Sequence, residues 1–540
     1  MDKEIENINN IIIGAGPGGL QLAYYFEKYH IEYIILERNL TSGSRYENFP
    51  NSNELLSINK KNNNSNNKEF NLRYDWNSLL NDEELLFKDY SDDYYPSNDD
   101  LHKYLNDFSS NFKLKIRYDQ NVIKISYNKD LLNYNIETSS LIYTCQKLII
   151  ATGMSIPNIP KCKKYIRNQD NIKHYSEFPK KYFLDKTNLN NFKNKSVLLV
   201  GLGNSSLELA NILNNYCTNI LITGQQRDFS IISHYDGDIR SKYMNFYDTF
   251  FLNNMNGIDN KILTEKDVII ENKKKDTENY GKYYILTNTE DGILFCNSIK
   301  YFDYIIYCTG YNFDMAIFDE NLKIMMNGKY PRLKINYESI NNNKLFFIGS
   351  LMHDIDCKKN SGGFIKGFRY LIKLFFKKNF MVKMNKIINF QFDGTSKIYN
   401  DLSFYIYNRI NNSSSLFNLP EYLVDVFYFD KETQKVNYYE DNIRFGLEIN
   451  FIDHAETNYL YILKLCYGNK LENFNKIGLY DKFNPTLLHP EIELLIKNEN
   501  NIFVLRDKII FEENLVGNFK DKENYYDKIL RSLKNFLVIL

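Results

Sequence analysis

The chain has 540 residues, of which 43% are hydrophobic and 25% charged, and its 67 basic and 67 acidic residues give a formal net charge of zero. This length predicts two or three domains, and the composition is typical of a folded chain rather than a disordered one. A net charge of zero argues against a general electrostatic attraction to nucleic acid or to anionic lipid.

The sequence indicates no targeting or membrane segment. The N-terminus is charged and reaches Ile11 without the apolar core of a secretory signal. No apolar stretch approaches the roughly 20 residues that span a bilayer, and the last four residues are not a retention signal. We therefore expect a cytoplasmic protein with no membrane span and no nucleic-acid partner.

Seven cysteines are scattered along the chain, and none forms a Cys-x-x-Cys pair. The sequence therefore offers neither the dithiol relay of a disulfide reductase nor the ligand spacing of a zinc site. We expect reduced, mostly buried thiols and no bound metal.

A glycine-rich turn follows an apolar run near the N-terminus. Ile11–Ile13 read as a strand, the next six residues are Gly-Ala-Gly-Pro-Gly-Gly, and a helical pattern follows. In a dinucleotide-binding unit Gly14 makes the turn, Gly16 lets the backbone approach the pyrophosphate, and Gly19 allows the helix to pack closely on the strand. The helix N-terminus then binds the phosphates.

The next apolar run, Tyr33–Leu36, ends in Glu37. Glu37 lies at the sequence distance from the glycine turn at which an acidic side chain binds the ribose hydroxyls of a dinucleotide. The alternative is that Glu37 is an ordinary polar residue at the end of a strand. The cofactor contacts expected from this first unit are Gly14, Gly16, Pro17, Gly18, Gly19, Glu37, Arg38 and Arg45.

A second strand, glycine turn and helix follow an Ala-Thr-Gly strand end at residues 151–153. The turn is Gly201-Leu202-Gly203-Asn204-Ser205-Ser206, in which Ser206 takes the place of the third glycine, a change that NADP sites often tolerate. Arg227 follows the next strand and suits a 2′-phosphate, although the adjacent Asp228 could neutralise it. The pattern favours NADPH over NADH, and an ordinary surface arginine is the alternative.

Two later strands end in small-residue turns, and Gly363 precedes a helix that we expect to extend to about Phe376. We expect the N-terminus of this helix to face the cofactor; a glycine-rich loop before a packing helix is the alternative. The cofactor contacts expected from these later units are Thr152, Gly153, Gly201, Gly203, Asn204, Ser205, Arg227, Thr309, Gly310, Gly349 and Gly363.

The order of these units resembles that of flavin-containing monooxygenases. The stretches between the units are similar to the family called FAD-dependent oxidoreductase domain-containing protein 2, at residues 57–60, 69–80, 94–96, 234–240, 361–370 and 488–490. The resemblance implies FAD binding, two Rossmann domains and, for the animal members, a role in protein degradation at the endoplasmic reticulum. Residues 172–178 hold only a degraded form of the monooxygenase fingerprint, so oxygenation does not follow from the likeness.

We therefore predict an α/β fold with two Rossmann-type dinucleotide-binding domains and an α+β C-terminal region. The FAD domain comprises residues 1–160 and 303–395, and an NAD(P)H domain is inserted at residues 161–302. The C-terminal region covers residues 396–540, where Pro420–Tyr428 and Tyr525–Leu540 have helical patterns.

The resemblance and the motifs together predict an FAD-dependent oxidoreductase that NADPH reduces. The electron acceptor is unknown; it is either a small molecule or a protein thiol or amine. Trp76 and Asn77 are the candidate catalytic residues, because Trp76 could cover the flavin and Asn77 could hydrogen-bond to it. The alternatives are a core tryptophan and an asparagine that caps a helix beginning near Ser78.

Two other functions stay open at this point. One is a monooxygenase-like oxygenation of a soft nitrogen or sulfur. The other is an interaction protein that flavin stabilises and that binds its partner through residues 396–540. The sequence leaves the oligomeric state open.

Overall fold

The computed structural model describes most of the chain. The described residues are 5–47, 53–165, 170–225, 241–250, 255–259, 262–275, 277–286, 301–355, 360–381, 388–391, 397–430, 435–444, 457–468, 487–500, 502–514, 519–520 and 525–536.

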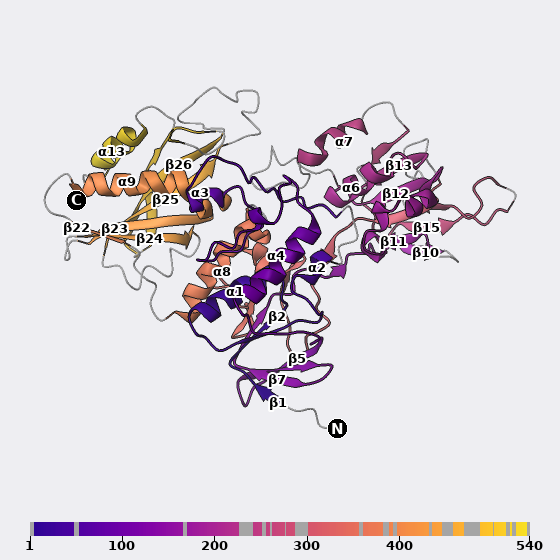
Figure 1. The fold of residues 1–540 in the computed structure, drawn as a ribbon, viewed down its shortest axis with the longest axis horizontal. Coiled ribbons are helices and arrows are strands. Elements are labelled where there is room, and N and C mark those ends of the chain that lie inside the picture. Colours follow the sequence, from indigo (N-terminus) through magenta and orange to yellow (C-terminus); the bar gives the residue numbers. More distant parts are fainter. Residues whose placement is uncertain are drawn as a thin grey trace.

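The first domain is built on a five-stranded parallel sheet (Figure 1). Its strands, in spatial order, are β21 (Leu345–Phe347), β8 (Lys147–Ile150), β2 (Asn10–Ile13), β3 (Ile34–Leu36) and β4 (Ile116–Arg117). Both faces of this sheet are covered, which explains why Ile11, Ile12 and Ile13 form a continuous apolar run instead of alternating with polar residues. The central strand β2 leads into the first glycine turn at the carboxyl edge, where ligands bind in such sheets.

Helices cover one face of this sheet and a β-meander covers the other (Figure 1). The helices are α1 (Pro17–Lys28), α4 (Asn98–Asn111) and α8 (Ile365–Phe380). The meander consists of the antiparallel strands β7 (Ile142–Cys145), β6 (Asn133–Thr138) and β5 (Val122–Asn128), and β1 (Ile5–Asn7) pairs in parallel with β7 at its edge. Ile12 packs with the helices, whereas Ile11 and Ile13 pack with the meander.

The second domain repeats this architecture around another five-stranded parallel sheet. Its strands are β11 (Ile172–His174), β17 (Tyr304–Tyr307), β12 (Ser196–Val200), β13 (Asn219–Thr223) and β14 (Gly257–Asp259). Helix α6 (Asn204–Leu213) packs on one face. The other face meets a smaller sheet of β10 (Lys163–Tyr165), β15 (Val268–Glu271) and β16 (Tyr283–Leu286).

Two short strands connect these domains. Strand β9 (Ile156–Pro157) leaves the first domain and pairs with β18 (Tyr311–Asn312), on which the chain returns. Gly153 and Gly310, which precede these strands, both have positive φ angles of 63° and 75°. Glycine adopts positive φ angles at no steric cost, so the chain changes direction sharply before each of the two strands that connect the domains.

The C-terminal region is built on a six-stranded antiparallel sheet covered by helices α9 (Lys397–Asn412), α10 (Ser414–Asn418) and α13 (Tyr525–Phe536). Its strands are β22 (Ile388–Gln391), β24 (Lys435–Ile443), β23 (Leu423–Asp430), β25 (Tyr459–Tyr467), β26 (Leu488–Lys497) and β27 (Phe503–Ile510). This sheet and helix α9 share one apolar core with α1 and α8 of the first domain.

The helix predicted over Pro420–Tyr428 is wrong, because β23 occupies most of that segment. Its run of apolar residues is buried on both faces of the sheet, and such a run has no periodicity that separates a strand from a buried helix. The helix predicted from Tyr525 is confirmed as far as Phe536.

The remaining helices and strands are short. They are α2 (Ser44–Glu47), α3 (Lys68–Asn71), α5 (Lys186–Leu189), α7 (Met244–Thr249), β19 (Met326–Asn327), β20 (Tyr330–Pro331) and the 3₁₀ turns Phe87–Asp89, Tyr175–Glu177, Tyr182–Leu184, Asn190–Phe192, Ser241–Tyr243, Gly349–Asp354 and Ser361–Gly363.

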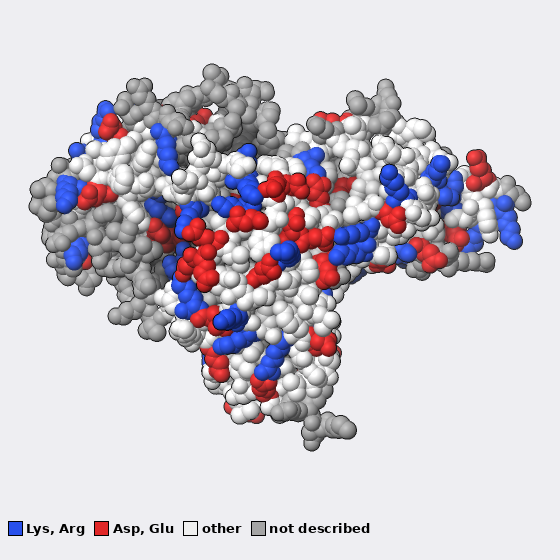
Figure 2. Space-filling view, in the orientation of Figure 1, with Lys and Arg blue, Asp and Glu red and all other residues white. Residues whose placement is uncertain are grey.

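The predicted fold class is confirmed: two parallel-sheet domains are followed by an antiparallel α+β region. Acidic and basic side chains are interspersed on the face drawn in Figure 2, in keeping with the zero net charge. Within the described part of the chain, no helix combines the length and the apolar character needed to cross a bilayer.

Candidate cofactor and active site

The first glycine turn is packed as the motif predicts. Gly14 has a φ angle of 105°, and a Cβ atom on Gly19 would lie 2.1 Å from the carbonyl oxygen of Gly14. A Cβ on Gly18 would lie 2.9 Å from the Cα of Gly349, which comes shortly after strand β21. Gly16 differs from these three, because a Cβ there would meet no atom within 4 Å. Its open side lines a cavity beside the N-terminus of α1, the position suited to a phosphate.

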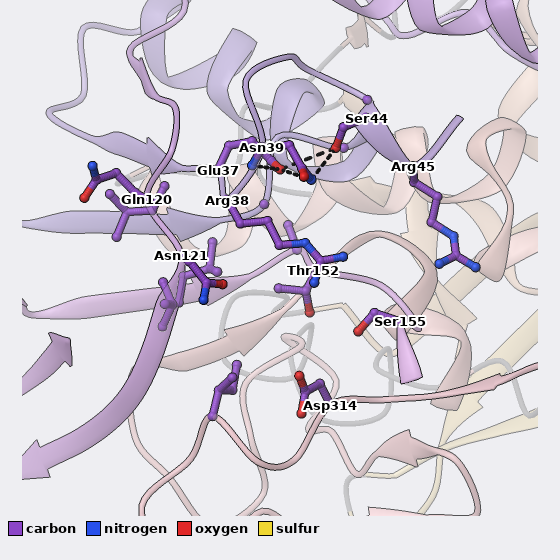
Figure 3. Close-up of a pocket in the computed structure, with 18 of the residues that line it drawn as sticks. Glu37, Arg38, Asn39, Ser44, Arg45, Gln120, Asn121, Thr152, Ser155 and Asp314 are labelled. Atoms are coloured by element: carbon purple, nitrogen blue, oxygen red, sulfur yellow. Dashed lines mark hydrogen bonds between the residues drawn. The ribbon is translucent and has the colours of Figure 1, made fainter. Parts of the chain in front are cut away.

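Glu37 ties the end of β3 to this turn. Its carboxylate accepts a hydrogen bond from the Ala15 amide at 2.8 Å. It also accepts one from the Asn39 amide at 3.0 Å (Figure 3). The side chain is buried, yet it lines a cavity of about 420 Å³ that we call the Glu37 cavity. Other polar residues around this cavity are Arg38, Asn39, Ser44, Arg45, Gln120, Asn121, Thr152, Ser155 and Asp314.

A larger cavity of about 900 Å³, the Trp76 cavity, adjoins the first and shares Gly16, Arg45 and Thr152 with it. The predicted residues that line the Trp76 cavity are Gly16, Pro17, Gly18, Arg45, Trp76, Asn77, Thr152, Gly153, Asn204, Ser205, Thr309, Gly349 and Gly363. Residues far apart in the sequence, from both Rossmann domains, thus meet around one space.

Several polar groups at these cavities are buried without a protein partner. Among the described residues, Asn77 Nδ2, Asn98 Nδ2 and Thr152 Oγ1 have no hydrogen-bond partner. All three residues line the Trp76 cavity. Buried polar groups are almost always hydrogen-bonded, so this set fits a polar ligand that fills the cavity. The open glycine cradle and these groups together fit a dinucleotide cofactor.

Trp76 and Asn77 lie on a turn and not before a helix. The Asp75 carboxylate accepts hydrogen bonds from the amides of Asn77 and Ser78, and no helix begins here, so the helix-cap alternative for Asn77 is wrong. The Asn77 amide oxygen accepts a hydrogen bond from the Ser57 hydroxyl at 2.6 Å. Trp76 is half-buried and lines the cavity, so it is not a core tryptophan.

The second glycine turn is also tightly packed. Gly201 has a φ angle of 112°, and a Cβ there would lie 2.5 Å from the carbonyl oxygen of Cys308. Ser206, in place of the third glycine, donates a hydrogen bond from its hydroxyl to the Gly203 carbonyl and accepts one from the Gly203 amide. The serine therefore caps the start of α6.

Four predicted contacts do not line either cavity. Gly19 and Gly201 act through packing, and a Cβ on Gly203 would meet nothing within 4 Å. Gly310 accepts a hydrogen bond at its carbonyl from Nε2 of the buried His174. Arg227 lies outside the described residues, so the choice between NADPH and NADH stays a prediction.

The structure gives the predicted Arg45 an aromatic neighbour and adds His353 and Lys366, which no sequence motif marks. The Arg45 guanidinium lies over the Tyr311 ring at 4.1 Å from its centroid, and both residues line both cavities. The buried His353 borders the Trp76 cavity, and a Cβ on Gly363 would lie 2.9 Å from its ring. Lys366 lines the same cavity from the first turn of α8. His353 and Lys366 reach the cavity only through tertiary packing, so local patterns could not find them.

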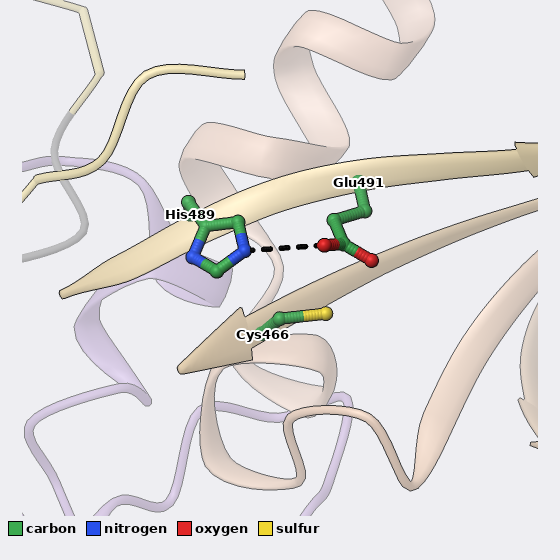
Figure 4. Close-up of side chains that lie close together, drawn as sticks. All are labelled: Cys466, His489 and Glu491. Atoms are coloured by element: carbon green, nitrogen blue, oxygen red, sulfur yellow. Dashed lines mark hydrogen bonds and ion pairs between the residues drawn. The ribbon is translucent and has the colours of Figure 1, made fainter. Parts of the chain in front are cut away.

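A separate cluster of buried polar groups lies on the C-terminal sheet. Cys466, His489 and Glu491 bring one ligand-type atom each within 4.8 Å of one another (Figure 4). However, the Glu491 carboxylate already pairs with the ammonium groups of Lys464 at 3.0 Å and Lys508 at 3.1 Å. Because two cations occupy the carboxylate, we interpret the cluster as an ion network, and the absence of a metal stays a prediction.

Comparison with known proteins identifies a matching family and similar chains. Residues 11–349 match the family model described as "Pyridine nucleotide-disulphide oxidoreductase". Two relatives, both named "FAD-dependent oxidoreductase domain-containing protein 2", come from Mus musculus and Danio rerio. The mouse protein is 28% identical over 528 residues, which cover 89% of this chain and 75% of the mouse chain. The zebrafish protein is 30% identical over 457 residues, which cover 77% of this chain and 64% of the zebrafish chain.

A solved structure, the bacillithiol disulfide reductase of Bacillus cereus, covers 69% of this chain and 100% of its own, with a TM-score of 0.49 and 16% identity. The two relatives confirm the resemblance carried by the stretches between the glycine motifs. Because the family model matches well over half of its residues, this chain belongs to the pyridine nucleotide-disulphide oxidoreductase family.

Proposed function

We propose that this chain is an FAD-dependent oxidoreductase whose flavin is reduced by NADPH. One observation carries the proposal: Gly16–Gly18 at the start of α1 and Asn204–Ser205 at the start of α6 line the same Trp76 cavity. Two helix N-termini, each suited to a dinucleotide pyrophosphate, thus open on one space. The names of the mouse and zebrafish relatives support FAD as one of the two dinucleotides.

The residues of the chain divide between the two halves of FAD. The Glu37 cavity would take the adenosine half, with Glu37 available to the ribose hydroxyls. Arg45 lines both cavities and would pair with the pyrophosphate between them. Asn77 and Thr152 would donate hydrogen bonds to the flavin end from atoms that have no other partner among the described residues. Bound flavin would supply the hydride and electron transfer that these side chains alone lack.

The electron acceptor is proposed to come from outside the protein. None of the five cysteines in the described residues, Cys145, Cys162, Cys217, Cys308 and Cys466, lines either cavity. A thiol relay of the kind used by disulfide reductases is therefore not built from this part of the chain. An external small molecule, or a thiol or amine of another protein, is the acceptor that we propose.

Anaerobic reduction of the purified protein tests the proposal. Addition of NADPH should bleach the visible flavin band, and a Gly203→Ala variant should keep its FAD and lose this bleaching. A Cβ at Gly203 would meet no protein atom, so the variant should fold normally while it crowds the second phosphate site. Gly257→Ala, on β14 of the same domain, is the matched control because its Cβ would make only an ordinary contact at 3.4 Å.

Failure of NADPH and NADH to bleach the flavin of the unmodified protein would overturn the proposed electron donor. If NADPH bleached the flavin of Gly203→Ala as fast as that of the unmodified protein, the second glycine turn would have no part in flavin reduction. Readmission of oxygen with amine or sulfide probes then tests the monooxygenase alternative, which predicts an oxygenated product. Arg227→Ala tests the preference for NADPH, because loss of a 2′-phosphate contact should raise the KM for NADPH and leave the KM for NADH unchanged.

A further inference from the structure

The segment that carries Trp76 is attached to the C-terminal region. It begins at α3, which contacts helices α9 and α10 of the C-terminal region (Figure 1). The Glu69 carboxylate accepts hydrogen bonds from the Ser414 amide at 2.9 Å and from the Ser414 hydroxyl at 2.8 Å. Glu69 therefore joins α3 to the first residue of α10, more than three hundred positions later in the chain.

Arg73 makes a second attachment to the C-terminal region, at the place where α9 ends and α10 begins. It is fully buried, and its guanidinium donates hydrogen bonds to the carbonyls of Ser413 at 3.0 Å and Ile410 at 2.8 Å. The guanidinium also lies 4.7 Å from the centroid of the Phe417 ring. Burial lowers the pKa of Arg73 to about 10, which still leaves it charged at neutral pH. Because burying a charge is costly unless it is hydrogen-bonded, these bonds hold the segment to the chain between α9 and α10.

Helix α8 holds the other side of the segment. The buried Arg369 donates to the carbonyls of Asp75 at 3.0 Å, Ser78 at 2.8 Å and Leu72 at 2.6 Å. These three carbonyls flank Trp76 and Asn77, the two residues of the turn that line the cavity. The turn is thus fixed between α8 and the corner where α9 meets α10.

We propose that Glu69 and Arg73 are positioning residues, through which the C-terminal region sets Trp76 and Asn77 against the cofactor. The inference rests on the proposed function, which assigns the Trp76 cavity to the flavin. It makes the C-terminal region part of the redox site, because side chains in a reactive constellation need support from buried hydrogen bonds. A shift of the α9–α10 corner would therefore move the two cavity residues.

Trp76 is the one tryptophan of the chain, so its fluorescence reports on this turn alone. The full-length protein is compared with four variants, before and after removal of FAD. Arg73→Lys keeps a cation but loses the planar fork that reaches two carbonyls, and Glu69→Ala loses the acceptor for Ser414. Glu69→Gln keeps an oxygen acceptor and serves as the rescue. Arg444→Lys disturbs a C-terminal ion pair with Glu493 that does not contact the segment.

We expect Arg73→Lys and Glu69→Ala to shift the Trp76 emission to longer wavelength and to raise its quenching by acrylamide about twofold, because a loosened turn opens locally. The Trp76 emission of Glu69→Gln and Arg444→Lys should stay as in the unmodified protein. The inference is overturned if neither Arg73→Lys nor Glu69→Ala changes the emission more than Arg444→Lys does. If Arg73→Lys does not fold, Glu69→Ala decides by the same criterion.

This experiment separates the two proposals. If the unmodified protein binds no FAD, or if NADPH does not reduce its flavin, the proposed function is wrong. The Trp76 emission of the FAD-free protein still reports on the turn in that case. Normal reduction of the flavin with unchanged emission in both variants removes the positioning role alone.

Discussion

The ammonium group of Lys366 lies over the ring of Trp76, with Nζ 3.3 Å from the ring centroid. Lys366 is buried in the first turn of α8, where the helix dipole disfavours a cation. Contact with the electron-rich ring face offsets part of this cost. A cation held at such a place, in the wall of the Trp76 cavity, is suited to stabilise negative charge inside the cavity.

Replacement of Lys366 should therefore make the bound flavin harder to reduce. In Lys366→Met the reduced, anionic form loses a nearby positive charge, and we expect the midpoint potential to fall by about 30 mV, which corresponds to about 1.4 kcal/mol for two electrons. Spectroscopic redox titration of the flavin band measures this shift. Lys373→Met, on the same helix but outside the cavity lining, is the control and should keep the original potential.

Two glycines of the first turn should respond differently to alanine. Gly19→Ala places a Cβ 2.1 Å from the Gly14 carbonyl oxygen and should lower the free energy of unfolding by about 1–3 kcal/mol, with or without FAD. Gly16→Ala meets no protein atom. It should leave the FAD-free protein equally stable and weaken FAD binding about tenfold, or about 1.4 kcal/mol. Thermal melts and flavin titration separate the two effects; a stable Gly19→Ala protein would contradict the packing of the turn.

Acid should weaken the connection between the two Rossmann domains at His174. Burial lowers the pKa of His174 from its ordinary value of 6.5, although the Gly310 carbonyl raises it in part. A histidine whose pKa is lowered in the folded protein contributes stability at pH values above its pKa in the unfolded chain. This contribution is lost as the pH falls through its pKa in the folded protein. Melting temperatures between pH 8 and pH 5 should fall more steeply for the unmodified protein than for His174→Gln.

The control for this measurement is His30→Asn, which removes an exposed histidine at a positive φ angle that asparagine tolerates. It should retain the original pH dependence. An equally steep fall in His174→Gln would show that other groups cause the acid sensitivity.

Glu491 should stabilise the C-terminal sheet fully above pH 4.5 and progressively less as the pH falls below 4.5. Burial alone raises its pKa, but the hydrogen bond from His489 and the charge of Lys464 hold the pKa of Glu491 well below its ordinary value of 4.5. A carboxyl whose pKa is lowered in the folded protein contributes stability at pH values above its pKa in the unfolded chain. This stability is lost as the pH falls toward the pKa in the folded protein. Glu491→Gln should cost about 3 kcal/mol at pH 7, and the difference from the unmodified protein should shrink below pH 4.5.

Urea unfolding at several pH values measures this difference, with the exposed Glu499→Gln as a control of near-zero effect. A cost of Glu491→Gln that is the same at pH 7 and pH 4 would contradict the assigned ion pairs.

The same cluster should bind no zinc. Lys464 and Lys508 neutralise the only carboxylate of the Cys466–His489–Glu491 group, so a divalent ion would have to displace two ammonium groups. After dialysis against zinc and then buffer, elemental analysis should find the same substoichiometric metal in the unmodified protein and in Cys466→Ala. Stoichiometric zinc that disappears in Cys466→Ala would establish a metal site instead.

The sequence by itself determined the two glycine turns, because the requirement is local. Gly14 and Gly201 each follow a short apolar strand and adopt positive φ, and the spacing to Gly19 and to Ser206 fixes where each helix begins. The order of these motifs along the chain predicted two Rossmann-type domains, and each domain has a parallel sheet. Local signals failed at β23, where burial on both faces removed the periodicity that distinguishes a strand from a helix.

Only the tertiary structure decided what surrounds Trp76. The contacts of Lys366 with Trp76 and of Arg73 with Ser413 join segments hundreds of positions apart. No periodicity encodes such pairs, since they depend on how α8 and the C-terminal region pack into one apolar core. The sequence could name Trp76 and Asn77 as candidates, but burial and long-range hydrogen bonds place them at the cavity.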